Sequence, residues 1–317
     1  MTEKRPMVIL TGPTAVGKTA LSIELAKKIN GSIISADSMQ VYRHMDIGSA
    51  KVMPEEMDGV RHYLIDEFEP DEEFHVVKFV ERAKEHLEEI YAEGKIPIIA
   101  GGTGFYIQAL LYDIDFTEQE CDEAYRAELE LLAAEKGAHY LHNMLREVDP
   151  ASADAIHANN IKRVIRALEF YHLSGKRISE HNEKEREKTS PYHFAYFVLT
   201  DERPHLYANI DKRVDLMIEQ GLVDEVQKLK NMGFHRDMVS MQGLGYKEIL
   251  DYLDGKTTLE EAIYIIKRET RHFAKRQLTW FRRERDVIWL DKQAYDYQDA
   301  KILDSMINIL KEKTIIN

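Results

Sequence analysis

An eight-residue motif near the start of the sequence constrains the fold more than any other feature. Residues 12–19 read GPTAVGKT and match the pattern G-x-x-x-x-G-K-[ST]. The apolar segment Met7–Leu10 precedes the motif, and a helical pattern over Ala20–Ile29 follows it. In a strand–loop–helix setting, the loop amides and the helix N-terminus surround phosphate oxygens, and the lysine adds a positive charge. The motif therefore predicts an α/β fold with a site for a di- or triphosphate.

The motif also indicates which residues contact the phosphates. We expect Lys18 to supply the charge and the hydroxyl of Thr19 to hold magnesium, the one cofactor that we expect. A glycine-rich turn without a ligand is the alternative. The predicted diphosphate-binding residues are Gly12, Pro13, Thr14, Ala15, Val16, Gly17, Lys18 and Thr19.

Strand and helix patterns alternate through the first third of the chain. Strands are predicted at Ser32–Ser35 and Ile96–Ala100, with an amphipathic helix at Val76–Tyr91 between them. Such alternation predicts βαβ units and a parallel sheet flanked by helices.

The strand pattern disappears between residues 116 and 190, where charged helical segments replace it. It returns at Tyr192–Leu199, and helices are predicted from there to the end. We therefore expect an α/β core formed by residues 1–115 and 191–317, with a helical insertion domain at 116–190.

Composition narrows the class of protein. The net charge of −13 argues against general nucleic-acid binding, although residues 267–285 hold eight Lys or Arg against two Glu. The single Cys121 has no Cys or His partner at metal-ligand spacing, so we interpret it as structural or incidental. No apolar run approaches about eighteen residues, and the start MTEKRPMVIL lacks a signal-peptide pattern. We expect a cytoplasmic protein without a membrane partner.

A second candidate for chemistry follows the strand at Ser32–Ser35. Asp37 stands at the carboxyl end of that strand, whereas the strand at Ile96–Ala100 runs into Gly-Gly-Thr-Gly without an acid. Asp37 is therefore the leading strand-end carboxylate near the phosphate loop. It can act as a general base or as a metal ligand. A helix or turn cap is the structural alternative, because aspartate is favoured at caps.

Arg213 is predicted to lie on the apolar face of a helix. Leu206, Ile210, Arg213 and Met217 recur at spacings of 4, 3 and 4, which places the guanidinium toward the core. A buried guanidinium requires an anion. That anion is either the diphosphate or an internal carboxylate.

A long helix opening at Thr258 is predicted to carry two opposite faces. Its apolar side consists of Ile263, Ile266, Phe273, Ala274, Gln277 and Phe281. Its basic side consists of Arg268, Arg271, Lys275 and Arg282. A basic stripe of this kind suits a phosphate backbone, and an ordinary solvated face is the alternative.

Together these segments resemble the tRNA dimethylallyltransferase (tRNA isopentenyltransferase) family. The matching segments run in order from residue 12 to residue 283: GPTAVGKT, IISADSMQVYRHMDIGSAK, HYLID, IIAGGTGFYIQALL, NNIKRVIRALE, LYANIDKRVDLMIEQGLVDEV, MQGLGYKE and KRQLTWFRR. Of these, ISADSMQVYR and GGTGFY are the most specific. His44 and Ser49 depart from the pattern and stand where Gly and Thr are expected. The sequence lacks the zinc-finger tail of eukaryotic members, so the resemblance is to the bacterial type.

The resemblance implies transfer of a dimethylallyl group from dimethylallyl diphosphate to N6 of an adenosine, with release of diphosphate. That adenosine is 3′-adjacent to the anticodon (tRNA position 37) in tRNAs that read codons beginning with U. It also implies a P-loop kinase-like core with an inserted helical domain. We expect the enzyme to act as a monomer.

The resemblance also assigns roles to residues. The implied catalytic residues are Asp37, Thr103 and Arg213. The implied contacts to the tRNA anticodon stem-loop are Asp37, Ser38, Met39, Gln40, Thr103, Arg126, Lys162, Arg163, Arg166, Gly245, Tyr246, Lys247, Arg271, Lys275, Arg276 and Arg282. Gly243 and Gly245 are equally explained as residues of a backbone turn.

Three other activities compete with this interpretation. A P-loop kinase for a small metabolite accounts for the loop but not for the basic helix or the insertion. An isopentenyltransferase for free adenine nucleotides needs neither of those features. A nucleotide-driven RNA-binding switch is disfavoured because a second strand-end acid is absent from the sequence.

Overall fold

The computed structural model describes residues 4–116 and 122–317. Cys121, which we interpreted as structural or incidental, lies outside the described residues. The chain forms two compact units, each described here by itself. One comprises Met1–Leu111 and Pro191–Asn317, and the other comprises Tyr112–Ser190.

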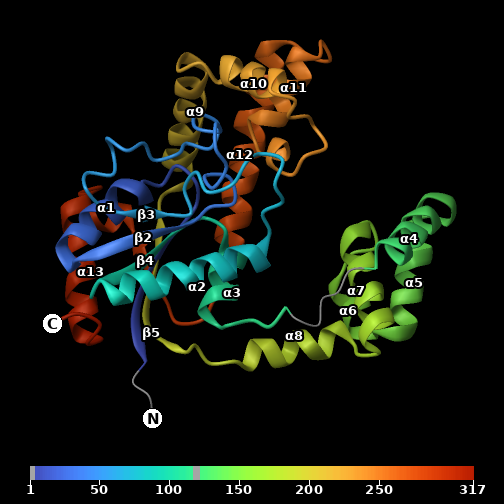
Figure 1. Cartoon of the computed structure of the whole chain (residues 1–317), viewed down its shortest axis with the longest axis horizontal. Helices are drawn as coiled ribbons and strands as arrows, with labels where there is room; N and C mark the ends of the chain where they lie inside the picture. Colours follow the sequence, from blue (N-terminus) through green and yellow to red (C-terminus); the bar gives the residue numbers. More distant parts are fainter. Residues whose placement is uncertain (1–3, 117–121) are drawn as a thin grey trace. The chain divides into compact units, whose positions relative to one another are not determined.

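A six-stranded sheet in the order β3-β2-β4-β1-β5-β6 forms the centre of the first unit (Figure 1). Every neighbouring pair is parallel. The strands are β1 (Arg5–Thr11), β2 (Gly31–Ala36), β3 (His62–Tyr63), β4 (Ile96–Gly101), β5 (Tyr192–Thr200) and β6 (Val287–Asp291). The predicted fold class, an α/β protein with a parallel sheet flanked by helices, is confirmed.

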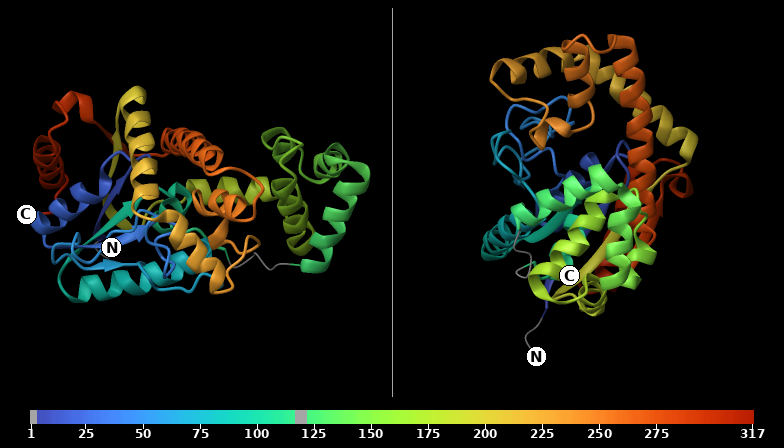
Figure 2. Two further views of the ribbon diagram at one scale, coloured as in Figure 1. Left: turned by 90° about the horizontal axis from the view of Figure 1, so that it is seen from above. Right: turned by 90° about the vertical axis from the view of Figure 1, so that its right-hand side faces the viewer.

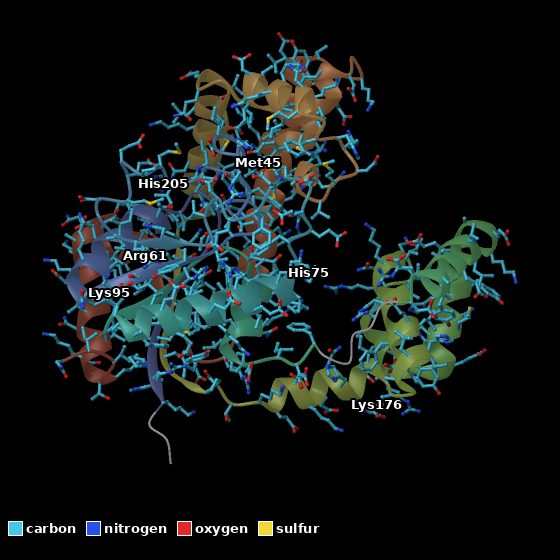
Figure 3. All side chains as sticks on the ribbon, in the orientation of Figure 1. Met45, Arg61, His75, Lys95, Lys176 and His205 are labelled. Carbon is cyan, nitrogen blue, oxygen red and sulfur yellow. The ribbon has the colours of Figure 1, made fainter. Side chains whose placement is uncertain are left out.

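Helices cover both faces of this sheet. The helices of the first unit are α1 (Lys18–Ile29), α2 (Val76–Ala92), α3 (Gly104–Leu111), α9 (Arg203–Glu219), α10 (Leu222–Asn231), α11 (Tyr246–Leu253), α12 (Leu259–Phe281) and α13 (Asp299–Glu312). Of these, α10 packs against α9 and α11, and α11 packs against α12. Two short 3-10 turns, Ser240–Gln242 and Lys292–Tyr295, complete the first unit. Figure 3 labels His75 and Lys95, which stand just before and just after α2.

Strand residues are buried on both sides of the sheet, which explains their continuous apolar runs. Val8 and Leu10 of β1 belong to the core cluster that includes residues of α1 and α13, and these two helices lie side by side (Figure 1). The alternate residues Met7 and Ile9 point to the other face and are equally buried. The left view of Figure 2 shows the sheet between α1 and α2.

Two strands were not predicted. The prediction of helices alone after β5 is wrong, because Val287–Asp291 forms β6 and pairs in parallel with β5. Burial along β6 is partial and Trp289 is exposed, as befits a strand at the edge of the sheet. The two-residue β3 is too short to produce a periodic pattern.

The second unit is helical in the part that the structure describes. Its helices are α4 (Glu123–Lys136), α5 (Ala138–Val148), α6 (Pro150–Ala155), α7 (Ile161–Ser174) and α8 (Ile178–Glu187). Aspartates begin two of them: Asp122 accepts a hydrogen bond from the Tyr125 amide, and Asp149 from the Ser152 amide. Leu129, Leu141 and Leu145 pack with residues of α7 to form a core of its own. Among the described residues of the whole chain, no helix is long and apolar enough to cross a membrane.

Candidate active site

Three strands of the sheet end side by side and bring the predicted motifs together. The phosphate loop follows β1, Asp37 follows β2, and the Gly-Gly-Thr-Gly turn follows β4. The Thr11 hydroxyl donates to the Gly101 carbonyl at 2.6 Å, and the Thr103 amide donates to the Ala36 carbonyl at 3.1 Å. Ligands of open parallel sheets bind at this carboxyl edge.

A cavity lies at this edge. It is lined by Thr14, Ala15, Gly17, Lys18, Thr19, Ser22, Ile33, Ser35, Asp37, Gln40, Ser49, Ala50, Val52, His62, Ala100, Gly101, Gly102, Arg213, Phe273 and Gln277. Asp37 and Arg213 therefore face the same cavity as the phosphate loop. Thr103 is not among these lining residues and directly follows one of them.

Lys18 folds back onto its own loop. Its Nζ donates to the carbonyl oxygens of Pro13 at 2.7 Å and Gly12 at 3.0 Å. Burial and the nearby positive charge of Arg213 lower the pKa of Lys18 to about 7, and Asp37 only partly opposes this shift. A bound anion would reverse the shift, because it favours the charged ammonium.

Asp37 is oriented by its own turn. Its Oδ1 accepts a hydrogen bond from the Met39 amide at 2.8 Å, so the turn-cap arrangement is present. Burial nevertheless raises the pKa of Asp37, against the opposing effects of the backbone amides, Lys18 and Arg213. A carboxylate has two oxygens, so a cap on one leaves the other for a proton acceptor.

Arg213 lies in α9 among the buried residues Leu206, Ile210 and Val214, as the helical spacing predicted. Its Nη1 donates to the Thr14 hydroxyl at 3.4 Å. The alternative of an internal salt bridge is not found: among the described residues, the carboxylate whose charge acts on Arg213 is Asp37, and no ion pair joins the two. Burial lowers the pKa of Arg213, and the field of Asp37 opposes that shift.

The charges around the cavity leave a net positive site. Among its lining residues Asp37 is the one carboxylate, facing Lys18 and Arg213. When Lys18 is protonated, two cations face one anion, and this balance favours an anionic ligand. Within residues 4–116 and 122–317, no three His, Cys, Asp or Glu side chains are grouped so as to hold a metal ion.

The wall of the cavity beyond Asp37 is held from a distant helix. Glu225 of α10 accepts hydrogen bonds from the amides of Asp46, Ile47 and Gly48 at 2.8–3.1 Å and from the Tyr246 hydroxyl at 2.9 Å. This fixes the loop that leads to Ser49 and Ala50, two lining residues. Sequence reasoning gave Glu225 no role.

The resemblance implies that Tyr246 contacts tRNA, but the structure buries this side chain completely. Tyr246 has none of its surface exposed, and its hydroxyl is bonded to Glu225. Its physical role is to support the 46–50 loop. Gly245 has φ 97° and precedes α11, so it serves the turn. A Cβ atom at Gly243 would meet the terminal methyl group of Met39.

The remaining implied contacts near Asp37 belong to a hydrogen-bonded chain. The Ser35 hydroxyl donates to Gln40 Oε1 at 3.2 Å, and Gln40 Nε2 donates to the Ala50 carbonyl at 3.1 Å. Ser38 and Met39 are partly exposed beside them. His62, Phe273 and Gln277 line the cavity without having been assigned to the site.

The basic side of α12 is only partly free of acidic partners. Arg271 is bonded to Asp211 and Lys267 to Asp215, both on α9, which ties α12 to α9. Lys275, Arg276 and Arg282 are exposed. The Thr258 side chain accepts from the Glu261 amide, as predicted for the start of this helix.

In the second unit, two of the implied tRNA contacts share one internal carboxylate. Arg126 and Arg166 both bind Glu169, which is fully buried, at 2.8 and 3.1 Å. Burial alone would raise the pKa of Glu169, but these hydrogen bonds outweigh it and lower that pKa. Lys162 and Arg163 are exposed on the same helix, and Lys247 lies near Glu248 in the first unit.

Comparison with known proteins identifies the family to which the chain belongs. Residues 40–284 match the family described as IPP transferase. The chain belongs to the IPP transferase family. A tRNA dimethylallyltransferase of Lachnoclostridium phytofermentans is 65% identical over 98% of this chain and 99% of its own length. One of Acetivibrio thermocellus is 52% identical over 95% and 96%.

Solved structures of the IPP transferase family agree with this fold. A tRNA isopentenylpyrophosphate transferase of Bacillus halodurans superposes with a TM-score of 0.73 at 47% identity, over 98% of both chains. A eukaryotic dimethylallyltransferase, captured acting on tRNA, gives 0.78 at 31% identity over 90% of this chain and 74% of its own. The resemblance drawn from the sequence motifs is confirmed.

Proposed function

We propose that the chain transfers a dimethylallyl group from dimethylallyl diphosphate to N6 of the adenosine 3′-adjacent to the anticodon (tRNA position 37), in tRNAs that read codons beginning with U. The observation that carries the proposal is the meeting of Lys18, Arg213 and Asp37 at one cavity in a member of this family. The names of the relatives support this activity over a small-molecule kinase or an adenine-nucleotide isopentenyltransferase.

The cations act on the leaving group. The loop amides, Lys18 and Arg213 bind the diphosphate, which gains negative charge as its bond to the allylic carbon breaks. Groups held in place for that charge stabilise the transition state without reorganising. The diphosphate also supplies the anion that Arg213 lacks within the described chain.

Asp37 acts on the acceptor. As the bond from N6 to the allylic carbon forms, the amine proton passes to the Asp37 carboxylate. The raised pKa makes this carboxylate a stronger base than an exposed aspartate. Thr103, which follows the lining residue Gly102, is proposed to lie near the reacting atoms. The adenosine must leave the anticodon-loop stack to reach them, at a cost of a few kcal/mol.

Magnesium fits beside the phosphate loop. The Thr19 hydroxyl lines the cavity, so an ion would be held by Thr19, the diphosphate and water, an arrangement that magnesium favours. Such an ion would offset charge on the diphosphate. We propose that the enzyme acts as a monomer on tRNA in the cytoplasm.

For tRNA binding, we propose the exposed cations of the two units. These are Lys275, Arg276 and Arg282 of α12 and Lys162 and Arg163 of α7. The half-buried Lys247, which lies near Glu248, is proposed to join them. Ser38, Met39 and Gln40 are proposed to contact the target adenosine and its neighbours. Arg126, Arg166 and Arg271 would contribute through the part of each guanidinium that their carboxylate partners leave exposed.

Nucleoside analysis tests the proposal directly. Unmodified tRNA is incubated with enzyme, magnesium and dimethylallyl diphosphate, digested to nucleosides and analysed by mass spectrometry. We expect N6-dimethylallyladenosine, and none when position 37 carries guanosine. Prenylation of free AMP in place of tRNA, or phosphate transfer from ATP to a metabolite, would contradict the assignment.

A further inference from the structure

Gln277 of α12 joins two parts of the cavity that lie far from it in sequence. Its Oε1 accepts a hydrogen bond from the amide of Thr14 in the phosphate loop at 2.9 Å. Its Nε2 donates to the carbonyl of Gly102, after β4, at 3.0 Å. Gln277 is 6% exposed and lines the cavity.

The space beside Gly102 is shaped for this amide. A Cβ atom at Gly102 would lie 2.2 Å from Nε2 of Gln277, far inside the contact distance of two heavy atoms. A side chain at position 102 would therefore displace Gln277.

We propose that Gln277 is a positioning residue that fixes the separation between the donor and acceptor parts of the site. The inference rests on the proposed function, in which the phosphate loop holds the diphosphate and the turn after β4 lies beside the reacting atoms. The Gln277 Oε1 binds the backbone of the phosphate loop, and the Gln277 Nε2 binds the backbone of the turn after β4. The backbone groups contacted cannot move apart without breaking a buried hydrogen bond.

The position of these two segments matters because the reaction joins two substrates. Reacting atoms must approach within about 3–3.5 Å, and a misplacement of about 1 Å can cost about 100-fold in rate. Loss of Gln277 should therefore lower the rate of the chemical step more than it weakens the binding of either substrate.

The first experiment measures single-turnover rates and donor dissociation constants for Gln277→Leu. We expect the rate to fall about 10- to 100-fold while the dissociation constant of dimethylallyl diphosphate changes less than about threefold. Gln298→Leu is the matched control, because Gln298 is exposed and its side chain makes no capping hydrogen bond. A wild-type rate in Gln277→Leu overturns the inference.

The second experiment separates positioning from a purely structural role. A glutamic acid at 277 reproduces both hydrogen bonds when protonated, but a carboxylate cannot donate to the Gly102 carbonyl. We expect the rate of Gln277→Glu relative to wild type to rise at least about fivefold from pH 8 to pH 6, following its protonation. The corresponding ratio for Gln277→Leu stays flat.

Dividing by the wild-type rate at each pH corrects for the titration that Lys18, Arg213, Asp37 and His62 show in the native cavity. Gln277→Leu shows the pH dependence of the ratio when residue 277 does not titrate. Equal, pH-independent ratios for the Glu and Leu variants would overturn the inference.

A double-mutant cycle tests the contact itself. Gly102→Ala should lower the rate about tenfold in the wild type but less than about twofold in Gln277→Ala, because the displaced side chain is then absent. Additive losses overturn the inference. If wild-type enzyme forms no prenylated tRNA, the proposed function fails. If it does and the variants match it, only the role of Gln277 fails.

Discussion

Binding of the diphosphate should draw a proton onto Lys18. In the structure its ammonium is bonded to the carbonyls of Gly12 and Pro13, and burial beside Arg213 lowers its pKa to about 7. A diphosphate at the loop adds negative charge in direct contact with Nζ. We expect the pKa to return toward the ordinary value of about 10.4.

The size of the effect follows from these two values. In the free protein Lys18 is protonated in about a tenth of the molecules at pH 8, about half at pH 7 and about nine tenths at pH 6. Binding should therefore take up about 0.9 proton per site at pH 8, about 0.5 at pH 7 and about 0.1 at pH 6.

Isothermal titration calorimetry in two buffers of different ionisation enthalpy measures this uptake. Dimethylallyl diphosphate is used without tRNA, so that no reaction follows. Lys18→Met and Lys18→Arg are the controls, because one removes the titrating group and the other keeps a permanent charge. Protonation of the ligand itself is common to all three proteins. An uptake at pH 8 that is the same in wild type and Lys18→Arg would refute the reasoning.

Four further outcomes are expected. Asp37→Asn should lower the single-turnover rate about 100-fold or more with little change in donor affinity; a near-normal rate excludes the general base. Arg213→Ala should weaken donor binding and slow the reaction. Single-turnover rates measured over a range of donor concentrations separate these two effects. Lys275→Ala combined with Arg282→Ala should reduce the slope of the logarithm of tRNA affinity against the logarithm of salt concentration, by an amount equal to the loss of up to about two phosphate contacts. An unchanged slope would remove α12 from the interface. His44 stands where glycine was expected and has φ 66°, so His44→Gly should stabilise the protein by about 0.5–1 kcal/mol in urea unfolding.

Much of the site could be predicted because its parts are locally encoded. The phosphate loop and Asp37 each follow an apolar strand, and parallel strands bring their carboxyl ends to one edge. Arg213 was found from helical spacing alone, since a charged residue among apolar positions must face the interior. These features depend only on residues near them in the chain.

Contacts between distant segments could not be predicted in this way. Gln277 was placed on the apolar face of its helix, but its hydrogen bond to Thr14 spans 263 positions, and no local pattern encodes it. The three amides that bind Glu225 belong to a loop almost 180 positions away. A basic stripe likewise does not reveal that Arg271 and Lys267 are bonded to acids of α9.

The position of β1 has a consequence for how the protein is made. This strand lies between β4 and β5, so one of its two neighbours is translated only after residues 112–190. At about 5–20 residues per second, a ribosome needs roughly 10–35 seconds to go from the end of β1 to the start of β5. Throughout that interval one edge of a strand whose centre, Met7–Leu10, is apolar stays unpaired. We expect the nascent chain to depend on chaperones until β5 emerges, and slower translation of the insertion to lower the yield of folded enzyme.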